Sequence, residues 1–142
     1  MNIGKRNELI EKIKKIGLPD NTEKTPVVSL EEFFDGNDDL GSIGCNLIDH
    51  PGIKHFFDLL TKIRSRPDVA DVLVGIYEVE EEDTTMWPFS EQVFIISNAS
   101  KNDISDWVKS LEVDDISVES PSIIKPSPDL PNNHKLFQLW WD

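Results

Sequence analysis

Two stretches in the middle of the chain are dominated by apolar residues and constrain the fold more than any other feature. The stretch Val69–Val79 is rich in β-branched residues, and its centre, Val72–Tyr77, is apolar on both faces. Such a run is typical of a central strand in a sheet that is covered on both sides. A second strand is predicted at Gln92–Ser97. The simplest arrangement of the two is an antiparallel hairpin with a long loop.

Four other segments have the apolar spacing or the capping residues of helices. Two of them begin with a capping box, in which a serine and an acidic residue three positions later satisfy free backbone N–H groups. The other two carry apolar residues at helical spacing and end at a glycine or before a proline. Helices are therefore predicted within Met1–Ile16, from Ser29 through Phe34, from Pro51 to Ser65 and from Ser100 to Leu111.

The remaining segments complete a small sheet. Short extended pieces are predicted at Val27–Val28 and Val113–Val118, and a last strand is predicted at Leu136–Trp141. Ser120–Asn133 holds four of the nine prolines and is predicted to be a rigid, irregular connection. This order predicts an α+β fold, with a mainly antiparallel sheet of about three to five strands and helices packed on one face.

The charge of the chain is strongly negative and unevenly distributed. The 142 residues include 14 Lys and Arg against 27 Asp and Glu, for a formal net charge of −13. Such a chain lacks the cations that electrostatic binding of nucleic acid requires, and an acidic membrane surface would repel it. Residues 1–24 hold six cations and four anions, whereas residues 25–142 hold eight cations and twenty-three anions. We therefore divide the chain into a basic amphipathic helix with its connector (1–24) and a single acidic α+β domain (25–142), on which the helix is expected to pack.

The cysteine content and the apolar runs indicate the compartment. Cys45 is the single cysteine, so it forms no intrachain disulfide, and a lone thiol suits a reducing cytosol. No stretch approaches the roughly 18 apolar residues of a membrane span. The sequence therefore predicts a cytoplasmic protein without a cofactor.

The segment Asp35–Asn46 is the most unusual local sequence. Asp and Asn side chains occupy the first, third and fifth positions of a calcium-binding EF-hand register. However, Leu40 stands where that register needs glycine, and Asn46 stands where it needs a bidentate glutamate. The favoured interpretation is a solvated turn whose glycines adopt positive φ and whose Asp and Asn side chains accept backbone hydrogen bonds. A calcium loop is the alternative.

A second cluster could support catalysis or metal binding. Cys45, Asp49, His50 and His55 lie close together in the sequence, and a Cys–His pair or a His–Asp pair is the minimum for nucleophilic or general-base chemistry. The simpler interpretation makes Asp49 or His50 a capping residue before Pro51. A small enzyme or a metal-dependent protein remains the alternative function.

Two acidic segments are candidates for a docking surface. Grouped carboxylates accelerate the encounter with a basic patch and fix its register, and aromatic neighbours supply interface energy. Trp87, Tyr77 and Phe89 are the aromatic residues next to the second segment. The predicted partner-binding residues are Asp35, Asp38 and Asp39 in the first segment, then Glu78, Glu80, Glu81, Glu82, Asp83 and Trp87 in the second.

Four motifs carry a resemblance to known proteins. They are Val28–Asp39, the following Gly41–Asn46, the turn Trp87–Ser90 and the terminal Trp140–Asp142. With these motifs, residues 26–142 resemble a group of small acidic, uncharacterised bacterial proteins, and this resemblance implies no catalytic residue. The chain is also similar in size, charge and compartment to immunity proteins of bacterial toxin systems, which is an analogy of class.

These observations favour a non-enzymatic protein-binding module. The expected partner is a basic bacterial protein such as a nuclease toxin, which an inhibitor or immunity-type protein would capture electrostatically. The carboxylates would occupy a cationic site that otherwise holds phosphate. The sequence does not determine the oligomeric state.

Overall fold

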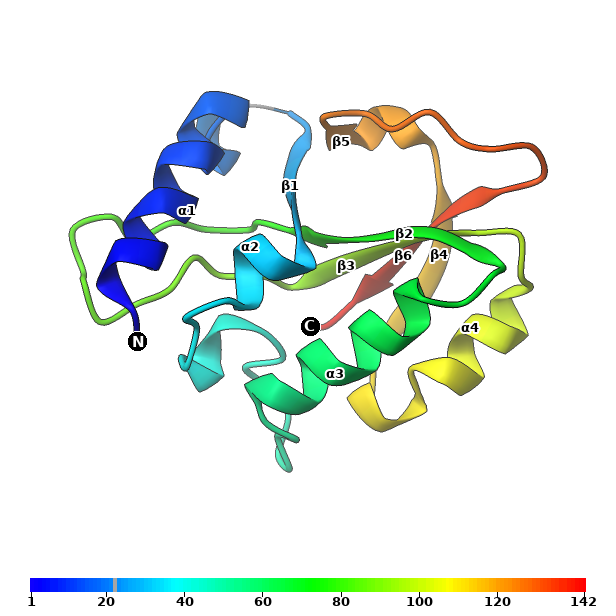
Figure 1. The fold of residues 1–142 in the computed structure, drawn as a ribbon, viewed down its shortest axis with the longest axis horizontal. Helices are drawn as coiled ribbons and strands as arrows, with labels where there is room; N and C mark the ends of the chain where they lie inside the picture. The colour runs from blue at the N-terminus through cyan, green and yellow to red at the C-terminus, as the bar shows by residue number, and fades with distance from the viewer. Residues whose placement is uncertain (22) are drawn as a thin grey trace.

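The computed structural model describes residues 1–21 and 23–142, which form four α-helices and six strands (Figure 1). The helices are α1 (Ile3–Ile16), α2 (Leu30–Phe34), α3 (Ile53–Arg64) and α4 (Lys101–Trp107). The strands are β1 (Thr25–Ser29), β2 (Val69–Gly75), β3 (Gln92–Ser97), β4 (Asp115–Glu119), β5 (Ile124–Lys125) and β6 (Lys135–Trp140). Four 3-10 turns connect them: η1 (Pro19–Asn21), η2 (Leu40–Ser42), η3 (Lys109–Leu111) and η4 (Pro121–Ile123).

The helix boundaries follow the capping residues that the sequence contains. Ser29 and Glu32 form the predicted capping box of α2, and Ser100 and Asp103 form that of α4. In each box the serine hydroxyl accepts from the third N–H of the helix, and the acidic side chain accepts from the serine N–H. The predicted helices after Pro51 and within the first sixteen residues are confirmed as α3 and α1.

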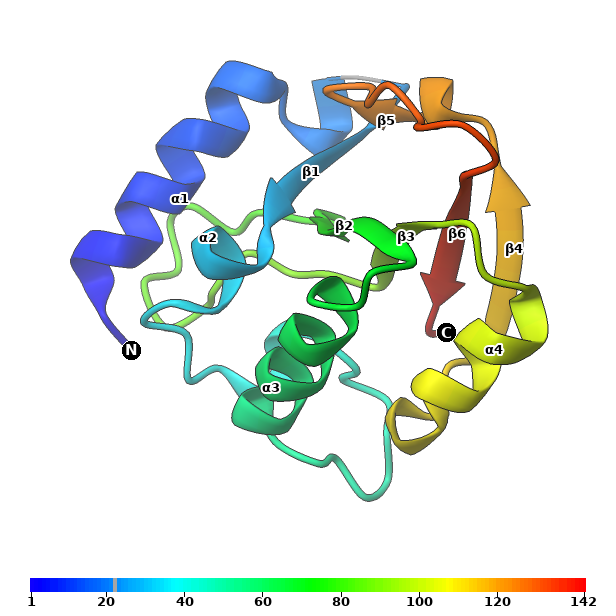
Figure 2. The same cartoon turned by 45° about the vertical axis from the view of Figure 1, so that its right-hand side comes forward.

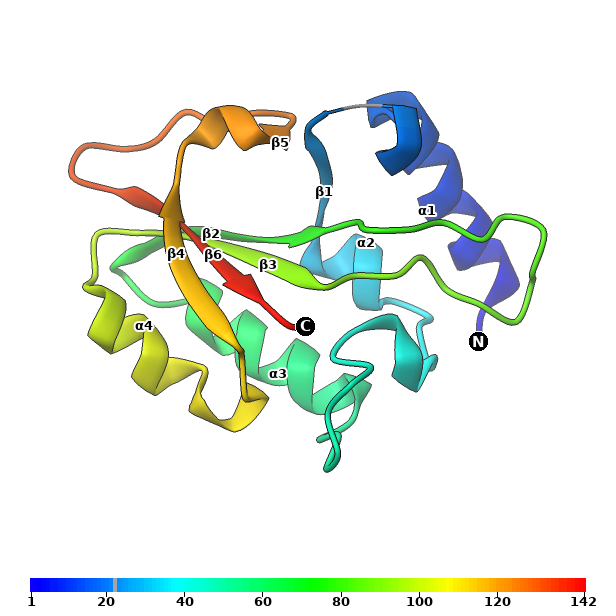
Figure 3. The same ribbon diagram turned by 180° about the vertical axis from the view of Figure 1, so that it is seen from behind.

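The strands form one curled sheet in the order β4-β6-β3-β2-β1-β5 (Figures 1 and 3). The predicted hairpin of β2 and β3 lies at its centre, and β1, β6 and β4 also pair antiparallel with their neighbours. The α+β class is confirmed, but the sheet has six strands where at most five were predicted, and one of its pairings is parallel. The missed strand is β5, which pairs in parallel with β1 through only two residues. So short a strand among prolines carries no periodicity by which the sequence could show it.

The two faces of the sheet bury separate hydrophobic clusters because side chains alternate along each strand. One face carries Val72, Val74, Val93 and Ile95, and it packs with apolar residues from all four helices. The opposite face buries a smaller cluster of five residues: Val27, Phe94, Ile96, Ile124 and Leu136. The helices therefore lie on one face of the sheet, as predicted.

The proline-rich segment covers part of the face that has no helices. It leaves β4 at one edge of the sheet, adds β5 at the other edge, and returns to β6 (Figure 2). Ile123 and Leu130 from this segment pack on the smaller cluster. The predicted irregular connection is thus a cover for one end of the sheet face, and the other end is left without it.

The connection between β2 and β3 extends beyond the sheet as an arm beside α1 (Figure 3). We call residues 76–91 the hairpin arm. Its base is held by backbone hydrogen bonds between Tyr77, Glu78 and Phe89. Toward its tip the arm has no strand pairing, so other groups must order it.

The guanidinium of Arg6, on α1, orders the tip through its N–H groups. Its side chain is 2% exposed, and its guanidinium donates to the carbonyl of Met86 at 2.7 Å, of Glu80 at 2.9 Å, of Asp83 at 3.0 Å and of Glu81 at 3.1 Å. A planar guanidinium can meet several acceptors at once, which the ammonium of lysine cannot do with the same geometry. Arg6 therefore attaches the tip of the arm to the N-terminal helix.

We predict that Arg6→Met lowers the free energy of unfolding by about 3 kcal/mol, because it removes several charge-assisted hydrogen bonds to partly buried carbonyls. Urea unfolding measures this loss, and amide exchange should show faster opening of residues 80–86. Lys5→Met is the control because Lys5 pairs with the exposed Asp35, and its effect should be much smaller. Equal urea midpoints for the two variants would contradict the role of Arg6.

Candidate functional site

The first acidic segment that the sequence predicted is engaged within the chain. Asp35 accepts from the Lys5 ammonium at 2.7 Å, and that contact raises the pKa of Lys5. Asp39 accepts from the Gly41 N–H at 3.1 Å through one oxygen and from the Trp87 N–H at 3.0 Å through the other. The interpretation of this loop as a turn is confirmed, since Gly36 and Gly44 have φ of +81° and +63°. Asp38 remains exposed and pairs with the amine of Met1.

The second acidic segment lies on the hairpin arm, where its backbone binds Arg6 and most of its acidic side chains are exposed. Its backbone carbonyls face Arg6, as described above, while the side chains of Glu80, Glu82 and Asp83 remain exposed. Glu81 forms an ion pair with Lys14 of α1, and this contact raises the pKa of Lys14. Hydrogen bonds from the Thr85 hydroxyl and N–H lower the pKa of Asp83. The basic helix thus neutralises part of the arm.

Trp87 is not on the surface of the arm. It is 1% exposed and belongs to the larger hydrophobic cluster. Its backbone N–H donates to the Asp39 carboxylate, and this bond joins this part of the arm to the loop after α2. We therefore leave the Trp87 ring out of the surface considered below, and Tyr77 takes its place as an accessible aromatic residue.

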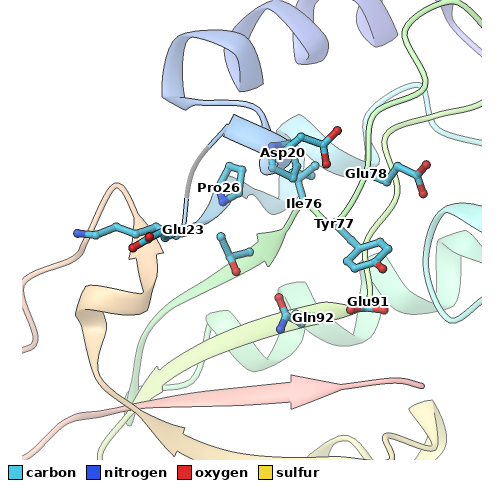
Figure 4. A pocket seen from close by; sticks show the side chains of 11 residues that line it. Asp20, Glu23, Pro26, Ile76, Tyr77, Glu78, Glu91 and Gln92 are labelled. Atoms are coloured by element: carbon cyan, nitrogen blue, oxygen red, sulfur yellow. The ribbon is translucent and has the colours of Figure 1, made fainter.

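A pocket of about 540 Å³ opens at the base of the hairpin arm (Figure 4). The connector after α1 supplies Asp20 and Glu23, the start of the arm supplies Tyr77 and Glu78, and the end of the arm supplies Glu91. This volume is within the usual range for sites that bind ligands or side chains. The remaining lining residues are Pro19, Lys24, Thr25, Pro26, Ile76 and Gln92. We call this feature the acidic pocket.

Two carboxyl groups of the acidic pocket have raised pKa values. A hydrogen bond with the Glu80 carboxyl raises the pKa of Glu78, and burial and the charges of Glu80 and Asp20 act in the same direction. Burial raises the pKa of Glu91 against a hydrogen bond from Trp140, and the charge of Asp142 adds to it. Within residues 1–21 and 23–142, neither Glu78 nor Glu91 forms an ion pair with a basic side chain.

Tyr77 gives the pocket an aromatic wall. Its side chain is 53% exposed and meets Phe89 edge to face, with ring centroids 5.8 Å apart. Below it, the Gln92 amide donates to the Gln138 amide oxygen at 3.3 Å across the sheet. An aromatic face surrounded by carboxylates attracts cations through the ring quadrupole as well as through charge. The arrangement is therefore complementary to a cationic group carried on an apolar stem.

Sequence reasoning found Glu78 and missed most of the pocket. Asp20, Glu23 and Glu91 are isolated acidic residues that belong to no charge run. They meet because β1 pairs with β2 and β2 pairs with β3, which brings the connector before β1 to the base of the arm. No local sequence signal shows such an assembly.

The two histidines of the cysteine and histidine cluster form hydrogen bonds with different parts of the fold. His50 Nδ1 accepts from the Gly52 N–H at 2.9 Å, so its Nε2 carries the proton that faces the Ile43 carbonyl at 2.7 Å. His55 Nε2 lies 2.9 Å from the Ser110 hydroxyl. Cys45 is exposed. Both ring nitrogens of His50 therefore hold the backbone around the start of α3.

The described part of the chain holds neither a cluster of metal ligands nor a membrane-spanning helix. Residues 1–21 and 23–142 contain no group of three or more His, Cys, Asp and Glu side chains placed to hold a metal ion. No helix in the same ranges is long and apolar enough to cross a membrane.

The fold and the pocket define a small α+β protein with an acidic surface site. The model of the Uncharacterized protein YfbO family matches residues 4–139, so the chain belongs to this family. The match includes nearly all of α1, which the resemblance seen in residues 26–142 left out. No activity is attached to the family by this description.

The similarity to one curated protein is partial. The chain is 40% identical over 82 residues to the "Uncharacterized protein YfbO" of Escherichia coli (strain K12), which covers 58% of this chain. The aligned region spans 56% of the relative, a little over half of its length. No solved structure matches the chain.

We predict that Glu91→Gln stabilises the protein at neutral pH. A carboxyl with a raised pKa binds its proton more tightly in the folded state, so its ionisation reduces stability as pH rises from its ordinary pKa through the raised one. The gain in Tm of the variant over the wild type should therefore grow between about pH 4 and about pH 7.

Glu31→Gln is the control with the opposite sign. Two hydrogen bonds from Arg64, at 2.7 and 2.5 Å, lower the pKa of Glu31, so its charge stabilises the fold near neutral pH. Its replacement should lower Tm near pH 7 and lose this effect as pH falls through the lowered pKa. A constant Tm difference for Glu91→Gln across the pH range would contradict the assignment.

Proposed function

We propose that this protein is a non-enzymatic binding module that captures a basic protein through the acidic pocket and the exposed carboxylates of the hairpin arm. The observation that supports this proposal most directly is that Asp20, Glu23, Glu78 and Glu91 line one open pocket together with the exposed ring of Tyr77. The charges of Glu80 and Asp20 help to raise the pKa of Glu78 there, and such repulsion at an open pocket is commonly a mark of a functional site.

A cationic partner would remove this repulsion on binding. A Lys or Arg side chain entering the pocket would contact Glu78 and Glu91 with its charge and Tyr77 with its stem or its cation. The carboxylates of Glu80 and Glu82 lie further along the same arm and would attract the partner before contact. The pocket would thus fix the position of the bound partner, and the arm would raise the rate of association.

The chemistry fits a partner whose own site normally binds phosphate. Such a site presents several cations, and a row of carboxylates can occupy it as an anionic substitute. A basic bacterial protein such as a nuclease toxin has this character, which makes an inhibitor or immunity-type role in the cytoplasm the most concrete form of the proposal. The net charge of −13 supports it, because that charge disfavours direct binding to nucleic acid.

A cationic probe tests the binding site without a known partner. We expect a synthetic nona-arginine peptide to shift the amide NMR signals of residues around Tyr77 and Gln92 more than those elsewhere. Replacing Asp20, Glu78 and Glu91 together by their amides should weaken binding by about tenfold or more at low salt. Raising the salt concentration should weaken binding to the wild type more than binding to the variant.

The matched control removes the same number of charges from other exposed positions, with Glu8→Gln, Asp49→Asn and Asp106→Asn. These side chains lie outside the acidic pocket, so this variant should keep most of the affinity. If both triple variants lose affinity equally, the peptide senses only net charge, and the pocket is not the binding site.

A further inference from the structure

The edge strand β4 has an open side. It pairs with β6 and stands at the end of the sheet order, visible at the margin of the fold in Figure 2. In residues 1–21 and 23–142, no strand pairs with its outer side. An unpaired edge is a template for another strand unless charge, curvature or a cover prevents it.

The register shows which backbone groups of β4 point outward. The backbone N–H of Trp141 donates to the backbone carbonyl of Glu91, which lies next to β3. The backbone carbonyl of Trp140 instead accepts from the backbone N–H of Asp114, which lies next to β4. Because backbone groups alternate along an antiparallel strand, Trp140, Gln138 and Leu136 face β4. Their partners there are Asp115, Ser117 and Glu119. The N–H and C=O groups of Ile116 and Val118 therefore point away from the sheet.

Val118 is the accessible centre of this edge. It is 51% exposed although it lies opposite the buried Phe137, whereas Ile116 is 6% exposed. In the part of the chain that the structure describes, no hydrogen bond outside the strand reaches Val118. A strand placed here would gain two backbone hydrogen bonds at Val118 and would cover its apolar side chain.

The charges around β4 determine which strand can pair with it. Glu112, Asp114, Asp115 and Glu119 surround the edge, and none of them forms an ion pair with a basic residue in the described ranges. A second copy of this chain, paired antiparallel about Ser117, would place Asp115 opposite Glu119. Like charges directly opposite destabilise a strand pair, so a second copy is disfavoured and a cationic strand is favoured.

The edge is also continuous with the acidic pocket. Asp115 pairs with Trp140, Trp140 with Gln92, and Gln92 lines the pocket. This row crosses three neighbouring strands on the sheet face without helices. One partner could therefore contact the edge and the pocket together.

We propose that β4 is a docking edge for an extended strand of a basic protein, which pairs its backbone with Val118 and alternates Lys or Arg with apolar residues. The cationic side chains lie on the face of Asp115, Ser117 and Glu119, and the apolar ones lie on the face of Val118. This inference rests on the proposed function for the charge of the partner. It adds the conformation that the partner adopts and a second surface that it contacts.

The test uses a blocked peptide, Lys-Val-Lys-Val-Lys, and a control peptide of the same composition, Val-Val-Lys-Lys-Lys. We expect the alternating peptide to bind at least tenfold more tightly and to slow amide exchange at Val118. Val118→Pro removes the outward N–H without removing a β4–β6 hydrogen bond, so it should abolish the preference between the peptides. Val118→Thr keeps the N–H and should retain the preference.

Each outcome decides the inference. Equal affinity for the two peptides, or an unchanged preference in Val118→Pro, overturns it. If the proline variant does not fold, the double variant Asp115→Asn and Glu119→Gln replaces it and should reduce the preference at least fivefold. The pocket variant with Asp20, Glu78 and Glu91 neutralised should keep the preference at the edge, so failure of the acidic pocket and failure of the edge are distinguishable.

Discussion

The contact of one buried arginine with four carbonyls orders the tip of the hairpin arm, which carries the exposed carboxylates of the proposed function. Arg6 lies on α1, far from the hairpin arm in the sequence, and its guanidinium reaches the arm where strand pairing has ended. A guanidinium withdrawn from water must be satisfied by acceptors, and the carbonyls of a tight turn provide several at once. The arm and the helix therefore order each other. Tyr77 and Glu78 lie at the base of the arm, where backbone hydrogen bonds to Phe89 continue the strand pairing toward the tip that Arg6 holds.

The sequence predicted the elements whose signals are local. The two capping boxes, the apolar stripe of α3 and the apolar centre of β2 all depend on residues within one turn or one strand, and each is confirmed. It failed for β5, because two residues between prolines become a strand only when β1 is already beside them. The burial of Trp87 also depends on distant residues. Its backbone N–H, for example, donates to Asp39, 48 residues away in the sequence.

For the candidate site, the sequence indicated the type of chemical group and not the full set of residues that form the pocket. The sequence indicated carboxylates as the working groups, and Glu78 and the exposed acids of the arm remain part of the proposal. It could not separate these from Asp35 and Glu81, because the cations that engage them, Lys5 and Lys14, are distant in the sequence. Nor could it identify Asp20 and Glu91, which join the pocket only through the order of the strands. A charge run shows composition, whereas the pairing of each charge is a property of the fold.

The asymmetry of the sheet explains why both proposed surfaces include carboxylates on the face without helices. All four helices pack on one face and bury its centre, so that on β4 only Val118 at the edge of this face is exposed. The proline-rich cover hides only one end of the opposite face, around Phe94 and Leu136. At the other end Gln92 and Trp140 remain partly accessible, with carboxylates on both sides of them. A partner that recognises the sheet must approach from this end, and it meets negative charge at the edge before it reaches the pocket. On the proposed binding of a basic partner, these carboxylates would attract the partner first at the edge and then at the pocket.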